Sequence, residues 1–220
     1  MNNQAINTSA FGYSSFFFNS DFEDILKGII ECYYCVASAN AKLPNNENLI
    51  RDELLSKKYL KSKIFKKAHP PLHKYQFDKE TAEDKGRVDI RILYVDPYKD
   101  DDAYYVIECK RLNNENTTGT TGLNAEYISE GIARFASEKY SMYENTAGMI
   151  GFVVEKMDIP QNISAINTLL SQHFTYINTE VTLTYKAIAS GFKYSYFSKH
   201  KIAGISKIIY HLMFDFSENV

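Results

Sequence analysis

The chain has 220 residues, with 25 Lys and Arg side chains against 27 Asp and Glu side chains and a formal net charge of −2. This balance argues against a general polyanion binder, and no run of about 18 apolar residues indicates a membrane span. Hydrophobic residues make up 45% of the chain, so we expect one domain over residues 1–220. No basic segment followed by an apolar one opens the sequence, which leads us to expect a cytoplasmic protein.

The first predicted helix follows a polar segment that ends in an aromatic cluster. The tetrapeptide of residues 20–23 resembles a capping box, which marks the start of many helices. Behind it, Ile25, Ile29 and Tyr33 recur at helical spacing. We therefore predict a helix over residues 20–39.

A second helix is predicted just after Pro44, with Asn46 as its N-cap. Glu47, Ile50 and Leu54 fall on one face at i, i+3 and i+7 spacing, so Glu47 lies on the apolar, inward face. An acid on that face is a candidate site residue, and Glu53 is the second choice on the same helix. The alternative is that Glu47 only stabilises the positive end of the helix dipole.

The second helix is expected to continue through a basic stretch. A stripe of this kind can face nucleic-acid phosphates, with Lys57, Lys58 and Lys61 as the candidates, or it can be a solvated helix face. Between residues 51 and 67 the chain carries seven basic side chains: Arg51, Lys57, Lys58, Lys61, Lys63, Lys66 and Lys67.

Two strands joined by a turn follow in the middle of the chain. Residues 87–95 alternate apolar and polar side chains, as in a half-buried strand, and residues 103–110 form the returning strand. Glu108 and Lys110 share one face of the returning strand because side chains alternate along a strand. A hairpin therefore brings Asp89 beside Glu108 and Lys110.

Two neighbouring carboxylates with a lysine at their side have the composition of a cation site for phosphate chemistry. Asp89 and Glu108 supply the hard oxygen ligands that Mg²⁺ prefers, and Mg²⁺ usually binds through one or two carboxylates plus phosphate oxygens. Lys110 would orient water or offset charge on the phosphate. The alternative is a solvent-facing hairpin on which these three side chains have no special role.

The remaining sequence alternates helical and extended patterns. Glu130 and Arg134 lie at i and i+4 in the next helix, so they either pair on its surface or Arg134 contacts a substrate phosphate. The predicted elements are a polar loop over 113–122, a helix over 124–143, a buried strand over 148–154, a helix over 159–174 and strands over 181–185, 192–197 and 207–216.

The segments Gly86-Arg87-Val88-Asp89-Ile90 and Val106-Ile107-Glu108-Cys109-Lys110 resemble the active-site strands of the PD-(D/E)xK superfamily of restriction-endonuclease-like phosphodiesterases. The sequence departs from that pattern where Val88, not Pro, precedes the Asp. The resemblance implies an α/β fold of the mixed-sheet, α+β kind with an αβββαβ core over residues 45–155. Residues 1–44 would be a helical extension, and residues 156–220 would complete the sheet.

The resemblance also implies an activity. Asp89, Glu108 and Glu47 would hold Mg²⁺ or Mn²⁺, Lys110 would act in catalysis, and the protein would be a DNA endonuclease of restriction, repair or phage-defence type. A homodimer is a possible assembly for a duplex-cutting enzyme. The alternative is a non-catalytic domain of the same fold that binds nucleic acid or a protein.

Overall fold

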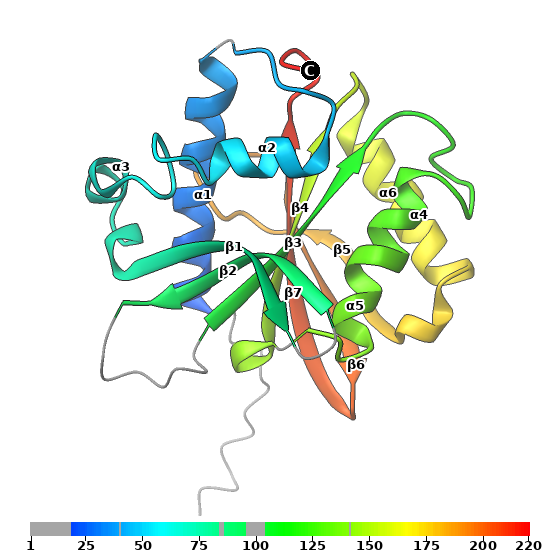
Figure 1. The fold of residues 1–220 in the computed structure, drawn as a ribbon. Coiled ribbons are helices and arrows are strands. Elements are labelled where there is room, and N and C mark those ends of the chain that lie inside the picture. Colours follow the sequence, from blue (N-terminus) through cyan, green and yellow to red (C-terminus); the bar gives the residue numbers. More distant parts are fainter. Residues whose placement is uncertain (1–18, 40, 84–85, 96–103, 141) are drawn as a thin grey trace, which may run out of the picture.

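A seven-stranded mixed sheet forms the centre of the computed structural model, which describes residues 19–39, 41–83, 86–95, 104–140 and 142–220 (Figure 1). Its strand order is β1-β2-β3-β4-β7-β6-β5. Strands β3, β4 and β7 are parallel, and the remaining neighbours are antiparallel. The strands are β1 (Tyr75–Glu83), β2 (Gly86–Tyr94), β3 (Tyr104–Leu112), β4 (Thr146–Val153), β5 (Thr179–Tyr185), β6 (Ser195–Ile202) and β7 (Ile205–Asp215).

Helices cover both faces of this sheet, with α1 and α2 on one side and α4, α5 and α6 on the other (Figure 1). In the described residues, no helix is long and apolar enough to cross a membrane. The α-helices are α1 (Ser20–Ser38), α2 (Glu47–Leu54), α3 (Lys63–Ala68), α4 (Leu123–Tyr127), α5 (Ala133–Ala136) and α6 (Ile159–Gln172). The π-helix η3 (Ile128–Ile132) joins α4 to α5, and the 3₁₀ helices are η2 (Leu72–Lys74), η4 (Tyr143–Asn145) and η5 (Thr175–Ile177).

Each face of the sheet packs against its own hydrophobic core because side chains alternate along every strand. On β4, Ile150 and Phe152 belong to the core beneath α1, and Met149 and Val153 belong to the core beneath α6. All eight residues of β4 are buried, as predicted for a central strand with both faces covered.

The mixed-sheet α/β class is thus confirmed, and several boundaries differ from expectation. The strand β1 was not predicted, since its sequence of charged and polar residues lacks a clear apolar alternation. The helix predicted over 124–143 ends at Ala136. The first helix is capped by Asn19, whose side chain accepts a hydrogen bond from the Phe22 amide, and not by the expected capping box. The turn over 96–102 and residues 1–18 lie outside the described residues.

The helix that begins at Glu47 ends at Leu54, so the expectation that it continues through the basic stretch is wrong. Leu55 and Leu60 are both buried, and the Leu60 amide donates a hydrogen bond to the Leu54 carbonyl at 3.1 Å. The chain turns because a straight helix could not place both leucines in the core beneath α1.

Candidate active site

The end of the β2–β3 ladder brings the predicted carboxylates together. Backbone pairing of the two strands starts at Ile90 and Ile107, and Asp89 lies just beyond it. The Oδ2 atom of Asp89 accepts a hydrogen bond from the Cys109 amide at 2.8 Å, so a side chain replaces the missing backbone partner. Asp89, Glu108 and Lys110 line the same cleft, as the sequence predicted.

Glu108 is the most deeply buried acid of the cleft, at 1% exposure. Its Oε1 atom accepts hydrogen bonds from Lys110 Nζ at 3.0 Å and Arg134 Nη1 at 2.7 Å. Its Oε2 atom is buried and has no hydrogen-bond partner among the described residues. Burial, followed by the negative charge of Asp89, raises the pKa of Glu108 to about 7.

Lys110 is held by three acceptors that use all the protons of its ammonium group. Lys110 Nζ donates to Glu47 Oε1 at 3.0 Å, to Glu108 Oε1 at 3.0 Å and to the Cys109 carbonyl at 2.8 Å. Burial lowers the pKa of Lys110, but the carboxylates around it outweigh burial and raise that pKa above its ordinary value. The ammonium group is therefore charged and fixed in place.

Glu47 reaches the site from the first turn of α2. Asn46 caps this helix by accepting a hydrogen bond from the Leu49 amide at 3.1 Å, as predicted. Glu47 Oε2 accepts a hydrogen bond from the Arg111 amide at 2.9 Å, and its other oxygen holds Lys110. Glu53, the second choice, does not line the cleft. The structure thus brings Glu47 to Lys110 and not into direct contact with the other two acids.

Arg51 is a site residue that the sequence analysis did not single out. It is 1% exposed and donates hydrogen bonds to Asp89 Oδ1 at 2.9 Å and Glu80 Oε1 at 3.0 Å. A third acid, Asp52, accepts from both its Nε and its Nη2. The sequence held one signal for this role. Arg51 lies four residues after Glu47, on the same helix face as Ile50 and Leu54, and a side chain at that position points toward the site.

Glu80 shows that the backbone near Arg51 is strained. It has φ +49°, a left-handed conformation that costs a non-glycine residue about 1 kcal/mol or more. The β1–β2 ladder pairs the residues on either side of Glu80 and Asp89 but not these two with each other. Strain of this kind often gathers at functional sites, where surrounding contacts maintain it.

Arg134 and Tyr140 connect the buried acid to the edge of the cleft. Arg134 Nη1 donates to Glu108 and to the Tyr140 hydroxyl at 2.6 Å, and its Nη2 donates to Glu130 at 3.0 Å. The Tyr140 hydroxyl in turn donates to the Arg87 carbonyl at 2.8 Å. Arg134 therefore pairs with Glu130, as one reading of the i,i+4 spacing predicted, and also holds Glu108.

Gly131 lets the helical segment that carries Arg134 pass close to the sheet. A Cβ atom at this position would overlap the Cε atom of Met149 and would lie 3.7 Å from Lys110 Cγ. The residue lies in η3, and π-helical turns frequently accompany functional sites. The close approach is what allows Arg134 to reach Glu108.

The cleft has a volume of ≈ 290 Å³ and an even balance of charge. Four acidic residues (Glu47, Glu80, Asp89 and Glu108) and four basic residues (Arg87, Lys110, Arg134 and Lys139) line it, together with Asn48 and Tyr140. Because the charges balance, the cleft does not repel a phosphate as an isolated carboxylate pair would.

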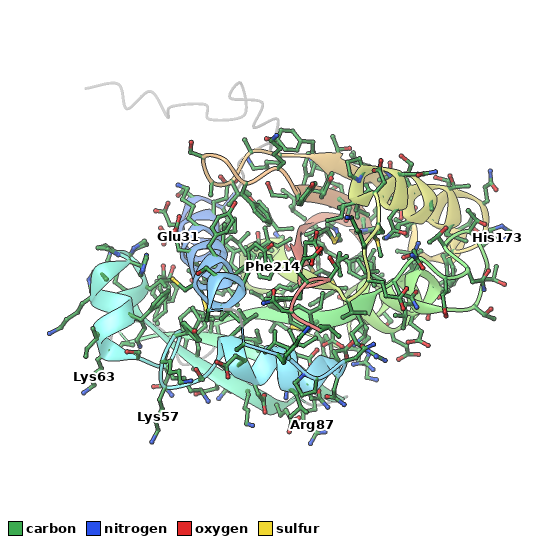
Figure 2. All side chains as sticks on the ribbon, turned by 90° about the horizontal axis from the view of Figure 1, so that it is seen from above. Glu31, Lys57, Lys63, Arg87, His173 and Phe214 are labelled. Carbon is green, nitrogen blue, oxygen red and sulfur yellow. The ribbon has the colours of Figure 1, made fainter. Side chains whose placement is uncertain are left out.

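The three lysines predicted to bind nucleic acid lie elsewhere. Lys57, Lys58 and Lys61 are exposed in the turn between α2 and α3, and none of them lines the cleft. Figure 2 shows Lys57 beside the region of α3, well apart from Arg87 along the same edge of the molecule. Their separation follows from the end of α2 at Leu54.

The cleft offers few ligands for a divalent cation. In the part of the chain that the structure describes, no group of three or more Asp, Glu, His and Cys side chains converges closely enough to hold a metal ion. Asp89 and Glu108 nevertheless lie at one cleft, and one oxygen of Glu108 has no partner in the segments that the structure describes. Two carboxylates are sufficient for Mg²⁺, which takes its other ligands from water and phosphate.

No family model, curated protein or solved structure matches this chain. The geometry of the cleft is therefore the basis for a functional proposal.

Proposed function

We propose that this protein is a divalent-metal-dependent phosphodiesterase that cleaves DNA. The observation that carries the proposal is Glu108, which lies in one cleft with Asp89 and Lys110. Its carboxylate is 1% exposed, and its Oε2 atom has no partner within the described ranges. A buried, unpartnered carboxylate oxygen is costly to the fold. A cation bound between Glu108 and Asp89 would remove that cost.

The element order supports the finer assignment of the fold. From α2 onward the chain runs helix, three strands, helix, strand, if α3 is counted with α2 and α4 to α5 as one helical segment. This is the order of the restriction-endonuclease-like core that the sequence resembles, and β1 supplies the strand that the sequence analysis missed. We take residues 45–155 to be such a core, and DNA to be the substrate that this resemblance implies.

Each side chain then has a defined task. Asp89 and Glu108 would hold Mg²⁺ or Mn²⁺, with Glu47 as a further ligand through water or as the residue that keeps Lys110 in place. When bound, the cation lowers the pKa of water and offsets negative charge on the phosphate. Lys110 places a fixed positive charge where a phosphate in the cleft would gain negative charge. Arg51 and Arg134 orient the two carboxylates.

The test is a cleavage assay with the purified chain, supercoiled plasmid and Mg²⁺ or Mn²⁺. We expect nicking that EDTA abolishes and that Lys110→Ala and Asp89→Asn each slow by about 100-fold or more, as for loss of other charge-stabilising groups. Lys63→Ala, an exposed lysine on α3, is the matched control and should cleave like the wild type. Thermal unfolding of each variant reports on folding.

Equal rates for the wild type and both site variants would identify a contaminating nuclease. Inertness toward plasmid, linear duplex, single-stranded DNA and RNA with either metal would overturn the proposal.

One observation favours a second candidate, a non-catalytic binding domain of the same fold. Asp89, Glu108 and Glu47 already pair with Arg51, Arg134 and Lys110, so the charges of the cleft are neutralised within the chain. Binding of nucleic acid without cleavage, unchanged by Mn²⁺, would support that candidate. Calorimetric Mn²⁺ titration separates the two candidates. The phosphodiesterase should bind Mn²⁺ and lose that binding in Glu108→Gln, whereas a domain without a metal site has no Mn²⁺ binding to lose.

A further inference from the structure

Arg87 and Lys139 lie at the edge of the same cleft and have no task in the site described above. Arg87 comes two residues before Asp89 on β2, so both side chains lie on one side of the strand, about 7 Å apart along it. A nucleic-acid strand with one phosphate at Asp89 would bring a neighbouring phosphate within reach of Arg87.

Arg87 differs from the other arginines of the cleft in its free donors. Arg51 is 1% exposed and pairs with three carboxylates, and Arg134 is 25% exposed and pairs with two. The Arg87 side chain is 66% exposed, and its one ion pair among the described residues is a 3.6 Å contact with Glu80. Its guanidinium therefore keeps donors for a bidentate bond to phosphate.

Lys139 lines the same cleft as Arg87 and lies close to the start of β2. A Cβ atom at position 86 would lie 2.8 Å from Lys139 Cε, so Gly86 is what lets the lysine chain lie across the start of β2. Tyr140, buried at 2% exposure, donates a hydrogen bond to the Arg87 carbonyl. None of the ion pairs among the described residues involves Lys139.

We propose that Arg87 and Lys139 form a phosphate-binding pair that holds the nucleic-acid backbone next to the position of cleavage. This inference rests on the proposed function in taking nucleic acid as the ligand. The guanidinium supplies a forked pair of donors, and the ammonium supplies a point charge in the same cleft. The pair contacts one or two phosphates, which fits a protein of net charge −2 that does not bind polyanions over its whole surface.

The test measures binding of a fluorescein-labelled 20-mer, single-stranded and duplex, with Ca²⁺ in place of Mg²⁺. In Arg87→Ala/Lys139→Ala the plot of log affinity against log salt should become shallower by about 0.7 to 1.8, because each of the one or two lost phosphate contacts contributes about 0.7 to 0.9 to its slope. Lys57→Ala/Lys58→Ala removes the same charge outside the cleft and should leave the slope unchanged.

Gly86→Ala is a second variant that keeps all charges. Its methyl group displaces the end of the Lys139 side chain, so the slope should fall by less than in the double variant. Thermal unfolding confirms that each variant is folded. Three results would overturn the pair. The salt dependence could be unchanged in Arg87→Ala/Lys139→Ala, or it could become shallower in Lys57→Ala/Lys58→Ala instead. The third is a wild type that binds neither probe at low salt.

The two proposals fail in distinguishable ways. If the wild-type protein binds DNA through Arg87 and Lys139 but never cleaves it, the phosphate-binding pair is supported and the phosphodiesterase proposal is wrong. If the wild-type protein cleaves DNA but the double variant binds with an unchanged salt dependence, the phosphodiesterase proposal is supported and the phosphate-binding pair is wrong.

Discussion

The fully buried guanidinium of Arg51 links α2 to the strands of the cleft. It contacts acids on three elements: Asp52 on α2, Glu80 on β1 and Asp89 on β2. Those acids keep part of their surface in water, with side-chain exposures of 30%, 33% and 15%. The arginine thus holds the Asp89 carboxylate and the second half of α2 in one arrangement.

Replacing this residue should therefore destabilise the fold. We expect Arg51→Met to lower the free energy of unfolding by about 3 kcal/mol, because three acids lose their common partner in a partly buried place. Urea denaturation measures the change. Lys79→Met is the control, since its 47% exposed side chain pairs with Asp52 at the surface and should cost less than about 1 kcal/mol. An Arg51→Met protein as stable as the wild type would contradict this account.

The sequence predicted the acids of the site better than their partners. Asp89, Glu108 and Lys110 follow from strand alternation alone, because a period of two and one antiparallel turn determine which side chains face each other. Two partners of Arg51, Glu80 and Asp89, lie 29 and 38 residues away in the sequence, and no local pattern specifies such contacts. Burial of Arg51 was also hidden, since arginine in a basic stretch usually faces solvent.

At the scale of elements, the packing of α1 depends on one glycine. A Cβ atom at Gly28 would lie 2.5 Å from Leu72 Cγ, with both methyl carbons of that side chain at 2.6 Å. Leu72 is fully buried in η2, the short helix that leads into β1. The missing side chain of Gly28 is therefore what lets η2 and β1 lie against α1.

Gly28→Ala tests this contact. Alanine favours the helix by up to about 1 kcal/mol, but displacing a buried leucine costs about 1 to 3 kcal/mol, so we expect a net loss of stability. In a Leu72→Ala background the clash is absent, and the same change should become neutral or stabilising. A double-mutant cycle by urea unfolding gives the coupling energy, and a value near zero would rule out the contact.

Elements with strong periodicity were predicted and elements set by tertiary packing were not. The strands β2, β3, β4 and β7 carry apolar alternation or continuous apolar runs, which are local signals. Strand β1 buries only Tyr75 and Phe77 as large apolar side chains, too few to give a clear alternating pattern. The end of α2 depends on burial of Leu60 in a core built from distant residues.

At the scale of the whole molecule, buried titratable groups lie in both halves of the sheet. Beside α4, a chain of hydrogen bonds runs from Tyr127 through His211, Ser198 and His200 to Thr179. Burial lowers the pKa of His200 to about 4 and holds the pKa of His211 well below its ordinary value. Both histidines are therefore neutral in the folded protein.

These groups act on stability in opposite directions. His200 has a pKa of 6.5 in the unfolded chain and of about 4 in the folded protein, so only the unfolded chain binds this proton between the two values. Acidification through this interval therefore costs about 3 kcal/mol of stability. Glu108 has a folded pKa of about 7 against an ordinary value of 4.5, so the folded state gains stability as it takes up a proton over that interval. In the metal-free protein, proton uptake by Glu108 thus offsets part of the acid-induced loss of stability that His200 and His211 cause.

Glu108→Gln should therefore make the protein more sensitive to acid. We expect its free energy of unfolding to fall by about 3 kcal/mol more than that of the wild type between pH 7 and pH 4.5, because the compensating proton uptake at Glu108 is gone. Urea denaturation in EDTA across this range gives the difference. Parallel pH profiles for the two proteins would show that residue 108 takes up no proton in that interval.

The hydrogen bond between Asp89 and the Cys109 amide has a practical consequence for anyone working with this protein in solution. That amide proton is bonded to the carboxylate itself, so its chemical shift and its exchange with solvent report directly on what the acid binds. In a ¹⁵N-labelled sample, one cross-peak would register the arrival of a cation or the loss of Arg51, with no substrate and no turnover. Cys109 is thus a built-in spectroscopic probe of the cleft.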